Sequence, residues 1–395
     1  MPNASESSPA LAVSGTRLVQ SLQRAGSGRS GPFVAILVVV AVLSLWPLVA
    51  GNPYILSAGV IVLNFAVFAT AWNLMGGLTG YVSLGHIAFF GLGSYGTGLL
   101  VIHTGINSFV AVAAAAVVVG AISLLVGWAA LRVRGASFVI VTIAIVLVLL
   151  LVFQSWRSVT GGSSGLVVPR PFPDLLRPEH HRVFFYIFLG LLLLVLVSYL
   201  VVDRSRFGQA LKAIREDEDK AQSLGIPTAR LKLAAFGISC FLTAIAGGMY
   251  ALWFGDLDPI FQFDVVLSAQ IALMALLGGV RYLFGPLVGA IVVGSALEYF
   301  LLNFGETQFH LVATGLLLVA VVLFAPDGVL ALVAQLIRRL GPSATSIREV
   351  SAAEVRAQQD ERVHAGTTGT AEDHSVGGSA VDSSRTDASE RRSDD

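Results

Sequence analysis

The feature that most constrains this chain is the absence of Asp, Glu, Lys and Arg between Arg29 and Arg132. A charged side chain at the centre of a membrane helix costs roughly 2.5–3.5 kcal/mol on insertion scales, so an uncharged run of this length is typical of several consecutive membrane spans. Charged residues make up 13% of the whole sequence, against about 25% in soluble globular domains. The sequence therefore predicts an all-α polytopic membrane protein.

The apolar runs of the sequence predict about ten (8–10) transmembrane helices, because each helix needs about 20 mostly apolar residues. The candidate segments lie near residues 33–51, 54–75, 86–103, 109–131, 137–154, 184–202, 232–253, 265–280, 286–303 and 309–325. The third segment is rich in glycine and the eighth is short. We expect broken or re-entrant segments at these two positions, where neighbouring protein covers the loose backbone.

The basic residues predict the orientation and the domain boundaries. Residues 1–32 read as a cytoplasmic leader, and the loops after the fourth, sixth, eighth and tenth spans are basic, as cytoplasmic loops usually are. Loop 155–182 carries four arginines on the predicted outer side, and we interpret it as a folded outer lid. Residues 33–340 then form the membrane domain. Residues 341–395 have almost no large apolar residues and are expected to be a disordered cytoplasmic tail.

The cytoplasmic loop 203–232 is predicted to contain an amphipathic helix. Its apolar residues recur at spacings of three, four and seven, at Phe207, Ala210, Leu211, Ile214, Ala221 and Leu224. Arg215 and Glu216 lie on the opposite face, and Gly225 is placed to end the helix. By this spacing, the helix either docks into a groove on a partner protein or lies on the lipid headgroups.

The stretch 73–98, NLMGGLTGYVSLGHIAFFGLGSYGTG, is the candidate solute path. Glycine lets a helix unwind, and unwound backbone at mid-membrane offers polar groups to a solute. A second glycine pair follows a similar apolar run in the second half. The expected path residues are Asn73, Gly76, Gly77, Thr79, Gly80, Tyr81, Ser83, His86, Gly278 and Gly279. The alternative is that the glycines are notches for helix packing and that His86 is an interior histidine with satisfied hydrogen bonds.

Several kinds of chemistry are missing from the sequence. It has no G-x-x-x-x-G-K-[ST] phosphate loop, so ATP hydrolysis is not expected in this chain. Cys240 is the sole cysteine, and no set of catalytic residues stands out. We expect a transport protein rather than an enzyme, with no metal site, no cofactor of its own and no nucleic-acid partner.

Five ordered segments resemble the permease subunits of branched-chain amino acid ABC transporters, most closely the M-type. They are NLMGGLTGYVSLGHIAFFGLGSY, GASFVIVTIAI at 135–145 with TGGSSGL at 160–166, the long segment at 206–251, ALLGGVRYLFGPLVGA at 275–290 and LFAPDGVLA at 323–331. Permeases for urea and short amides share the pattern, so the solute is not fixed by it. The VLVLLL that follows VTIAI departs from the family, where many members have an acidic residue.

The resemblance implies a multi-pass subunit of an ATP-driven importer in the bacterial inner membrane. It implies a second homologous permease subunit, two cytoplasmic ABC ATPases that bind ATP and Mg²⁺, and an extracytoplasmic solute-binding protein. It also implies that the helix from about Arg206 to Gly225 couples the permease to an ATPase. The alternatives are a urea or amide permease and a stand-alone secondary transporter, for which Glu298 would be the main ionisable candidate within a span.

Overall fold

The computed structural model describes residues 31–304, 312, 315, 316 and 319. These residues belong to one compact unit, Met1–Ala334. Apart from Gly31, Pro32 and the isolated positions just named, the expected leader, tenth span and C-terminal tail lie outside the described residues.

Within the described part of the chain, nine helical segments are long and apolar enough to cross a membrane. They are α2–α3 (Gly31–Leu43 and Trp46–Val49), α4 (Pro53–Thr79), α5 (His86–Thr104), α6 (Ser108–Ala130), α7 (Ala136–Ser155), α9 (Arg177–Arg204), α12 (Thr228–Phe254), α13–α14 (Pro259–Gln262 and Val265–Gly278) and α15 (Gly285–Phe304). These segments confirm the first nine predicted spans and the all-α class.

The remaining elements are short and lie between the spans. They are α8 (Arg157–Thr160), η1 (Gly162–Ser164), β1 (Leu166–Val167), α10 (Arg206–Glu216), α11 (Glu218–Ser223) and β2 (Asp256–Leu257). Strands β1 and β2 pair antiparallel, with Leu166 opposite Leu257. The 155–182 loop is therefore folded, as predicted, and it pairs with the acidic segment after α12.

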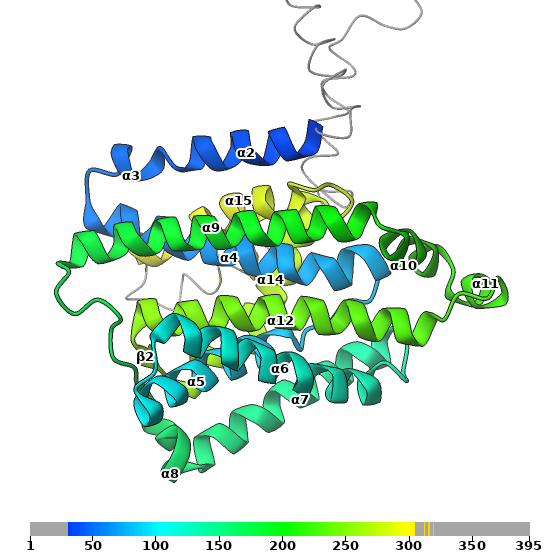
Figure 1. Ribbon diagram of the computed structural model, residues 1–395, viewed down its shortest axis with the longest axis horizontal. Coiled ribbons are helices and arrows are strands. Elements are labelled where there is room, and N and C mark those ends of the chain that lie inside the picture. Colours follow the sequence, from blue (N-terminus) through cyan, green and yellow to red (C-terminus); the bar gives the residue numbers. More distant parts are fainter. Residues whose placement is uncertain (1–30, 305–311, 313–314, 317–318, 320–395) are drawn as a thin grey trace, which may run out of the picture. The chain divides into compact units, whose positions relative to one another are not determined.

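Helices α4 and α12 lie at the centre of the bundle (Figure 1). Helix α4 contacts α9, α12, α14 and α15, while α12 also contacts α5 and α6. Both helices are apolar around most of their circumference, which is typical of a helix buried on all sides. Their small residues, such as Ala69 and Ala244, are fully buried. By contrast, α6 and α7 expose large apolar side chains such as Leu125 and Ile140, as lipid-facing helices do.

The two ends of the bundle carry different loops. Arg134 lies 2.7 Å from Asp219, and Arg281 lies 3.9 Å from Glu216, so the α6–α7 and α14–α15 loops share one end with α10 and α11. We call this the α10–α11 end. The loop at 155–182 and the acidic segment lie at the opposite, β1–β2 end. This is the grouping of loops that the alternating spans predicted.

Helices α5 and α12 approach until their backbones touch. A Cβ atom on Gly247 would lie 2.1 Å from the carbonyl oxygen of Phe90, and one on Gly93 would lie 2.2 Å from that of Ala244. No side chain fits at either position. Close packing through small residues is a main source of helix association in lipid, where water does not drive apolar surfaces together.

We expect Gly247→Ala to lower the stability of the protein by about 1–3 kcal/mol, the usual cost of overpacking. The matched control is Gly190→Ala on α9, because an added Cβ atom there meets nothing within 4 Å. Thermal unfolding in detergent measures both variants. Equal stability of the two would show that the α5–α12 contact is looser than described.

Candidate functional site

A tightly packed non-helical linker, residues 80–85, separates α4 from α5. Helix α4 stops at Thr79, and Gly80 takes the left-handed conformation with φ 76° that commonly ends a helix. The Trp72 indole Nε1 donates to the carbonyl oxygen of Ser83 at 2.7 Å, so the linker folds back along α4. Trp72 precedes Thr79 by about two turns, or roughly 10 Å. Helix α5, which begins at His86, therefore starts within the depth of the bundle. The third predicted span is itself a continuous helix, and the irregular backbone lies just before it, at residues 80–85.

A second interruption lies beside the first. Helix α14 ends at Gly278, and residues 279–284 lead into α15. The Asn73 side-chain Nδ2 donates to the carbonyl oxygen of Val280 at 3.2 Å. The two glycine-pair segments that the sequence analysis compared therefore touch each other next to Asn73.

Side chains of neighbouring helices satisfy the loose backbone, as a membrane interior demands. The Leu84 amide donates to Thr142 Oγ1 of α7 at 3.2 Å, and its carbonyl oxygen accepts from Ser268 Oγ of α14 at 2.8 Å. Ser239 Oγ of α12 lies 2.8 Å from His86 Nε2. Three helices thus hold the linker in place.

In this conformation most of the expected path residues are buried. The buried ones are Asn73, Gly76, Gly77, Thr79, Ser83, His86, Gly278 and Gly279, whereas Tyr81 is half-buried and Gly80 is exposed. Gly77 leaves room for a neighbouring side chain, since a Cβ atom there would lie 2.1 Å from Asn73 Oδ1. Asn73 Oδ1 and His86 Nδ1 find no hydrogen-bond partner among the described residues. Both features that the sequence suggested are therefore present at this break: a glycine that makes room for a neighbouring side chain, and buried polar atoms without hydrogen-bond partners.

A buried group of charged residues, which we call the Lys232 cluster, joins this linker to α11 and α12. The Lys232 side chain is only 3% exposed, and its Nζ lies 2.6 Å from Glu218 Oε1. Lys232 Nζ also donates to the Tyr81 hydroxyl at 2.9 Å, and that hydroxyl donates to Glu218 Oε2. The sequence analysis gave Lys232 no role, although a lysine within a predicted span was the available signal.

Arg134 extends the Lys232 cluster to the α6–α7 loop, 3.5 Å from Glu218 and 2.7 Å from Asp219. Burial raises the pKa of Glu218, but hydrogen bonds from Lys232 and Tyr81 and the charges of Lys232 and Arg134 outweigh it. They hold the pKa below its ordinary value of 4.5. Glu218 is therefore ionised at neutral pH, and four segments of the chain meet at its carboxylate.

The predicted helix over 206–225 is in fact two helices. The backbone of Asp217 is extended, and its side chain accepts from the amides of Asp219 and Lys220 to begin α11. Leu211, Ile214 and Ala221 are buried within the chain itself. This apolar stripe packs under the ends of α4, α9 and α12, so it positions the two helices and is not their outward face.

Arg215 ties α10 to α4 from the same side. Its Nη1 donates at 2.5 Å to the carbonyl oxygen of Gly77, one of the last-turn carbonyls that a helix leaves without an internal partner. The outward face is polar except for Leu224, whose side chain is 82% exposed. Phe207 and Ala210 are half-buried, Glu216 is exposed, and Gly225 ends the helix at φ 84°, as predicted.

At the β1–β2 end, six helices surround a cavity of about 530 Å³, which we call the acidic cavity. Its polar lining residues are Asn64, Tyr250, Asp256, Asp258, Gln262, Asp264, Gln270 and Glu298. Its apolar walls include Phe65, Phe90 and Leu297. None of the ten expected path residues lines it. Glu298 was expected as an ionisable residue within a span, but its position beside Asp256, Asp258 and Asp264 was not predicted.

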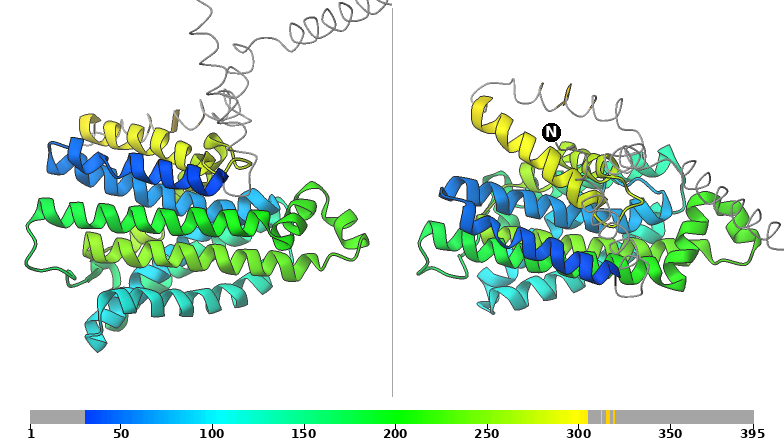
Figure 2. Two further views of the ribbon diagram at one scale, coloured as in Figure 1. Left: turned by 45° about the horizontal axis from the view of Figure 1, so that its top comes forward. Right: turned by 90° about the horizontal axis from the view of Figure 1, so that it is seen from above.

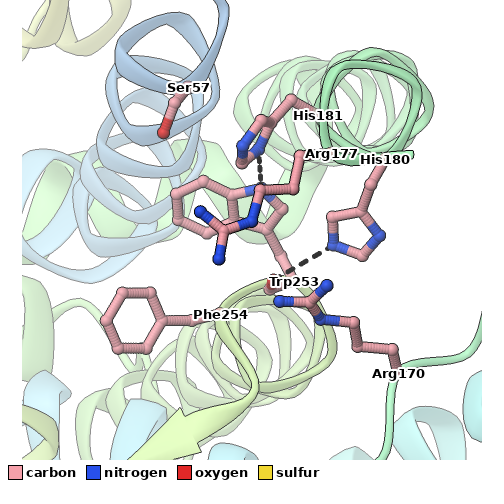
Figure 3. Close-up of a pocket in the computed structure, with 7 residues that line it drawn as sticks. All are labelled: Ser57, Arg170, Arg177, His180, His181, Trp253 and Phe254. Carbon is pink, nitrogen blue, oxygen red and sulfur yellow. Dashed lines mark hydrogen bonds between the residues drawn. The ribbon is translucent and has the colours of Figure 1, made fainter. Parts of the chain in front are cut away.

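A smaller cavity of about 200 Å³ at the same end, the basic cavity, is lined by Arg170, Arg177, His180 and His181 (Figure 3). His180 Nε2 lies 3.2 Å from the carbonyl oxygen of Trp253, whose Nε1 donates to His181 Nδ1 at 3.1 Å. Phe254 lines both cavities. Two of the four arginines of the 155–182 loop, Arg170 and Arg177, thus lie beside the acidic cavity.

The Lys232 cluster yields a thermodynamic prediction. Glu218→Leu or Lys232→Met alone strands a buried charge and should lower the free energy of unfolding by about 3–5 kcal/mol, whereas the double variant should recover most of that loss. Thermal or denaturant unfolding of the purified protein measures the three variants. Additive losses in the double variant would mean that the two side chains do not interact.

Comparisons with known proteins match most of this bundle. A family model described as branched-chain amino acid transport system / permease component matches residues 54–322. The match covers more than half of the 395 residues. In the described part of the chain it runs from α4 through α15 and includes both interruptions.

Named relatives agree with that match. The high-affinity branched-chain amino acid transport system permease protein LivM of Escherichia coli is 27% identical over 343 residues, covering 80% of this chain and 79% of LivM. LivH of Escherichia coli is 26% identical, covering 68% of this chain and 91% of LivH. BraD of Pseudomonas aeruginosa is 32% identical over 35% of this chain and 47% of BraD. The solved structure of PsaBC from Streptococcus pneumoniae aligns with a TM-score of 0.40 and 12% identity over 70% of this chain and 94% of that one, too low to carry an argument.

The family match spans the interrupted helices, the α10–α11 pair and eight of the nine membrane-spanning segments of the described residues, all but α2–α3. This chain is a multi-pass membrane protein and belongs to the branched-chain amino acid transport system permease family.

Proposed function

We propose that this chain is a permease subunit of an ATP-driven importer of branched-chain amino acids in the bacterial inner membrane. A second homologous permease, two cytoplasmic ABC ATPases and an extracytoplasmic binding protein complete the transporter. The α10–α11 end and both termini then face the cytoplasm, in keeping with the basic loops. Family membership supports the class, and the names of LivM and LivH support the solute.

The observation that carries the proposal is the position of α10 and α11. They lie beyond the ends of α4, α9 and α12 (Figure 2), and their inner side is tied to the interrupted helices through Arg215 and Glu218. A self-contained carrier has no need of such a projection. Since the sequence has no phosphate loop, an ATPase that docks on this projection is the natural source of energy.

The contacts give a route for the motion. A displacement of α10 and α11 pulls on the Gly77 carbonyl through Arg215 and on Tyr81 through Glu218. The linker and the end of α4 then move together, and the Asn73 contact with Val280 carries the motion to the second interruption. One displacement at the cytoplasmic end thus reaches both broken helices.

The positions of the acidic cavity and of α5 indicate the order of sites along the solute path. Phe90 lines the acidic cavity, and its ring stacks on Phe68 with centroids 5.2 Å apart. His86 lies one helical turn further along α5, toward the cytoplasmic end. The path we infer therefore runs from the acidic cavity, through this aromatic layer, to the interruptions, which are closed in this conformation.

Uptake in cells that lack this chain tests the proposed function. Restoring the chain should restore ATP-dependent uptake of labelled leucine, isoleucine and valine, and ATP depletion should abolish that uptake. Restored uptake of urea or acetamide alone would keep the transporter class and change the solute. Uptake that survives ATP depletion but fails when ion gradients collapse would overturn the proposal in favour of a secondary transporter.

Docking of the ATPase on the outward face has its own test. We expect Leu224→Asp to reduce co-purification of the ATPase and leucine uptake at least tenfold, because it places a charge on the exposed apolar residue that directly follows α11. The matched control is Leu176→Asp, since Leu176 is 71% exposed at the opposite end of the bundle. Normal ATPase binding by Leu224→Asp would place the docking surface elsewhere.

A further inference from the structure

The acidic cavity contains more hydrogen-bond acceptors than the protein uses. Asn64 is 3% exposed and Gln262 is 2% exposed, yet Asn64 Oδ1 and Gln262 Oε1 have no hydrogen-bond partner among the described residues. Both residues line the cavity, one from α4 and the other from α13. Buried oxygens without partners cost free energy, so their presence on a cavity wall indicates a ligand that donates hydrogen bonds.

The four carboxylates of the cavity are not equivalent. Asp258 and Asp264 each accept a hydrogen bond from a backbone amide at the start of α13 and α14, where an acidic residue commonly begins a helix. Asp256 is exposed. Glu298 is half-buried. Among the described residues its one hydrogen bond is a long one of 3.3 Å from Tyr54, and no cationic side chain pairs with it. Glu298 is therefore the carboxylate free to pair with a ligand.

The remaining residues of the cavity wall provide apolar surface and hydrogen-bond donors, which suit an apolar solute that also carries an anionic group. Phe65, Phe90 and Leu297 present apolar surface. The Tyr250 hydroxyl and the Gln270 amide line the same cavity and make no hydrogen bond within the described part of the chain, so they are available as donors. Aromatic faces also attract organic cations.

We propose that the acidic cavity is a binding site for a primary ammonium group attached to an apolar side chain, with Glu298 as the counter-charge and Asn64 and Gln262 as carbonyl acceptors. An ammonium group offers three donors and one positive charge, which matches two neutral acceptors and one carboxylate. The Tyr250 hydroxyl and the Gln270 amide receive the carboxylate of a zwitterion. The site rests on the proposed function and makes this chain itself selective for amino acids.

The same site rejects the neutral solutes that related permeases carry. Urea and short amides can donate to Asn64 and Gln262, but they bring no charge to Glu298 and little apolar surface to the walls. Desolvating Glu298 without a cation is costly, so such a solute gains little on entering. Selectivity between amino acids and amides then resides in this membrane subunit as well as in any binding protein.

Thiol protection in membranes tests the site without any need for transport. In a Cys240→Ala background, Leu301→Cys places a thiol on the cavity wall. Leucine and 3-methylbutylamine should slow its modification by a membrane-impermeant reagent. The same concentrations of 4-methylpentanoate, which lacks the ammonium group, and of urea should not. Glu298→Gln should raise the protecting leucine concentration at least tenfold, while Glu179→Gln, an exposed carboxylate on α9, should leave it unchanged.

The outcomes separate this site from the proposed function. Equal protection by urea or 4-methylpentanoate, or full protection of Glu298→Gln by leucine, would overturn the ammonium site even if ATP-dependent leucine uptake is intact. Should Glu298→Gln fail to reach the membrane, Asn64→Leu removes one acceptor and should also raise the protecting concentration. An unchanged value for a membrane-inserted Asn64→Leu would contradict the site as well.

Discussion

The buried ion pair of Lys232 and Glu218 is the interaction on which the rest of this structure depends. Removing either partner would leave a charge in a site almost closed to water, so the two residues hold each other in place. Glu218 begins α11, Lys232 lies near the start of α12, and the Tyr81 hydroxyl between them belongs to the α4–α5 linker. This one ion pair therefore joins α11 and α12 to the linker between α4 and α5.

The interruptions in turn explain the composition of the helices around them. Broken backbone within a membrane protein needs side-chain partners, and Thr142 of α7 and Ser268 of α14 supply them, while Ser239 of α12 contacts the His86 side chain. Each is a small neutral residue in an otherwise apolar helix. Acidic and basic side chains of the described residues gather toward the two ends of the bundle, in the Lys232 cluster at one and in the acidic and basic cavities at the other. These two ends are where the proposed ATPase contact and the proposed solute site lie.

Hydropathy predicted the nine spans of the described residues because each span is a long apolar run, and Gly80 marked the first break because a left-handed cap favours glycine. Periodicity also found the apolar stripe of Leu211 and Ile214, but spacing along a helix does not reveal what the stripe contacts. The stripe faces this chain's own helices. The Lys232 cluster and the acidic cavity could not be predicted, because the residues that form them are far apart in the sequence and meet only through helix packing.

The proposed coupling requires that α11 and the α4–α5 linker move as one body when the ATPase acts. Val82 and Gln222 are both exposed, so cysteines can be placed there and spin-labelled in a variant that lacks Cys240. Pulsed electron paramagnetic resonance then measures the distance between the two labels. The measurement is made in the assembled transporter, with and without ATP, under conditions that support uptake. We predict a single distance that ATP leaves unchanged. A shift of about one helical turn, roughly 5.4 Å, would show that the Lys232 cluster opens during transport and would contradict the proposed coupling.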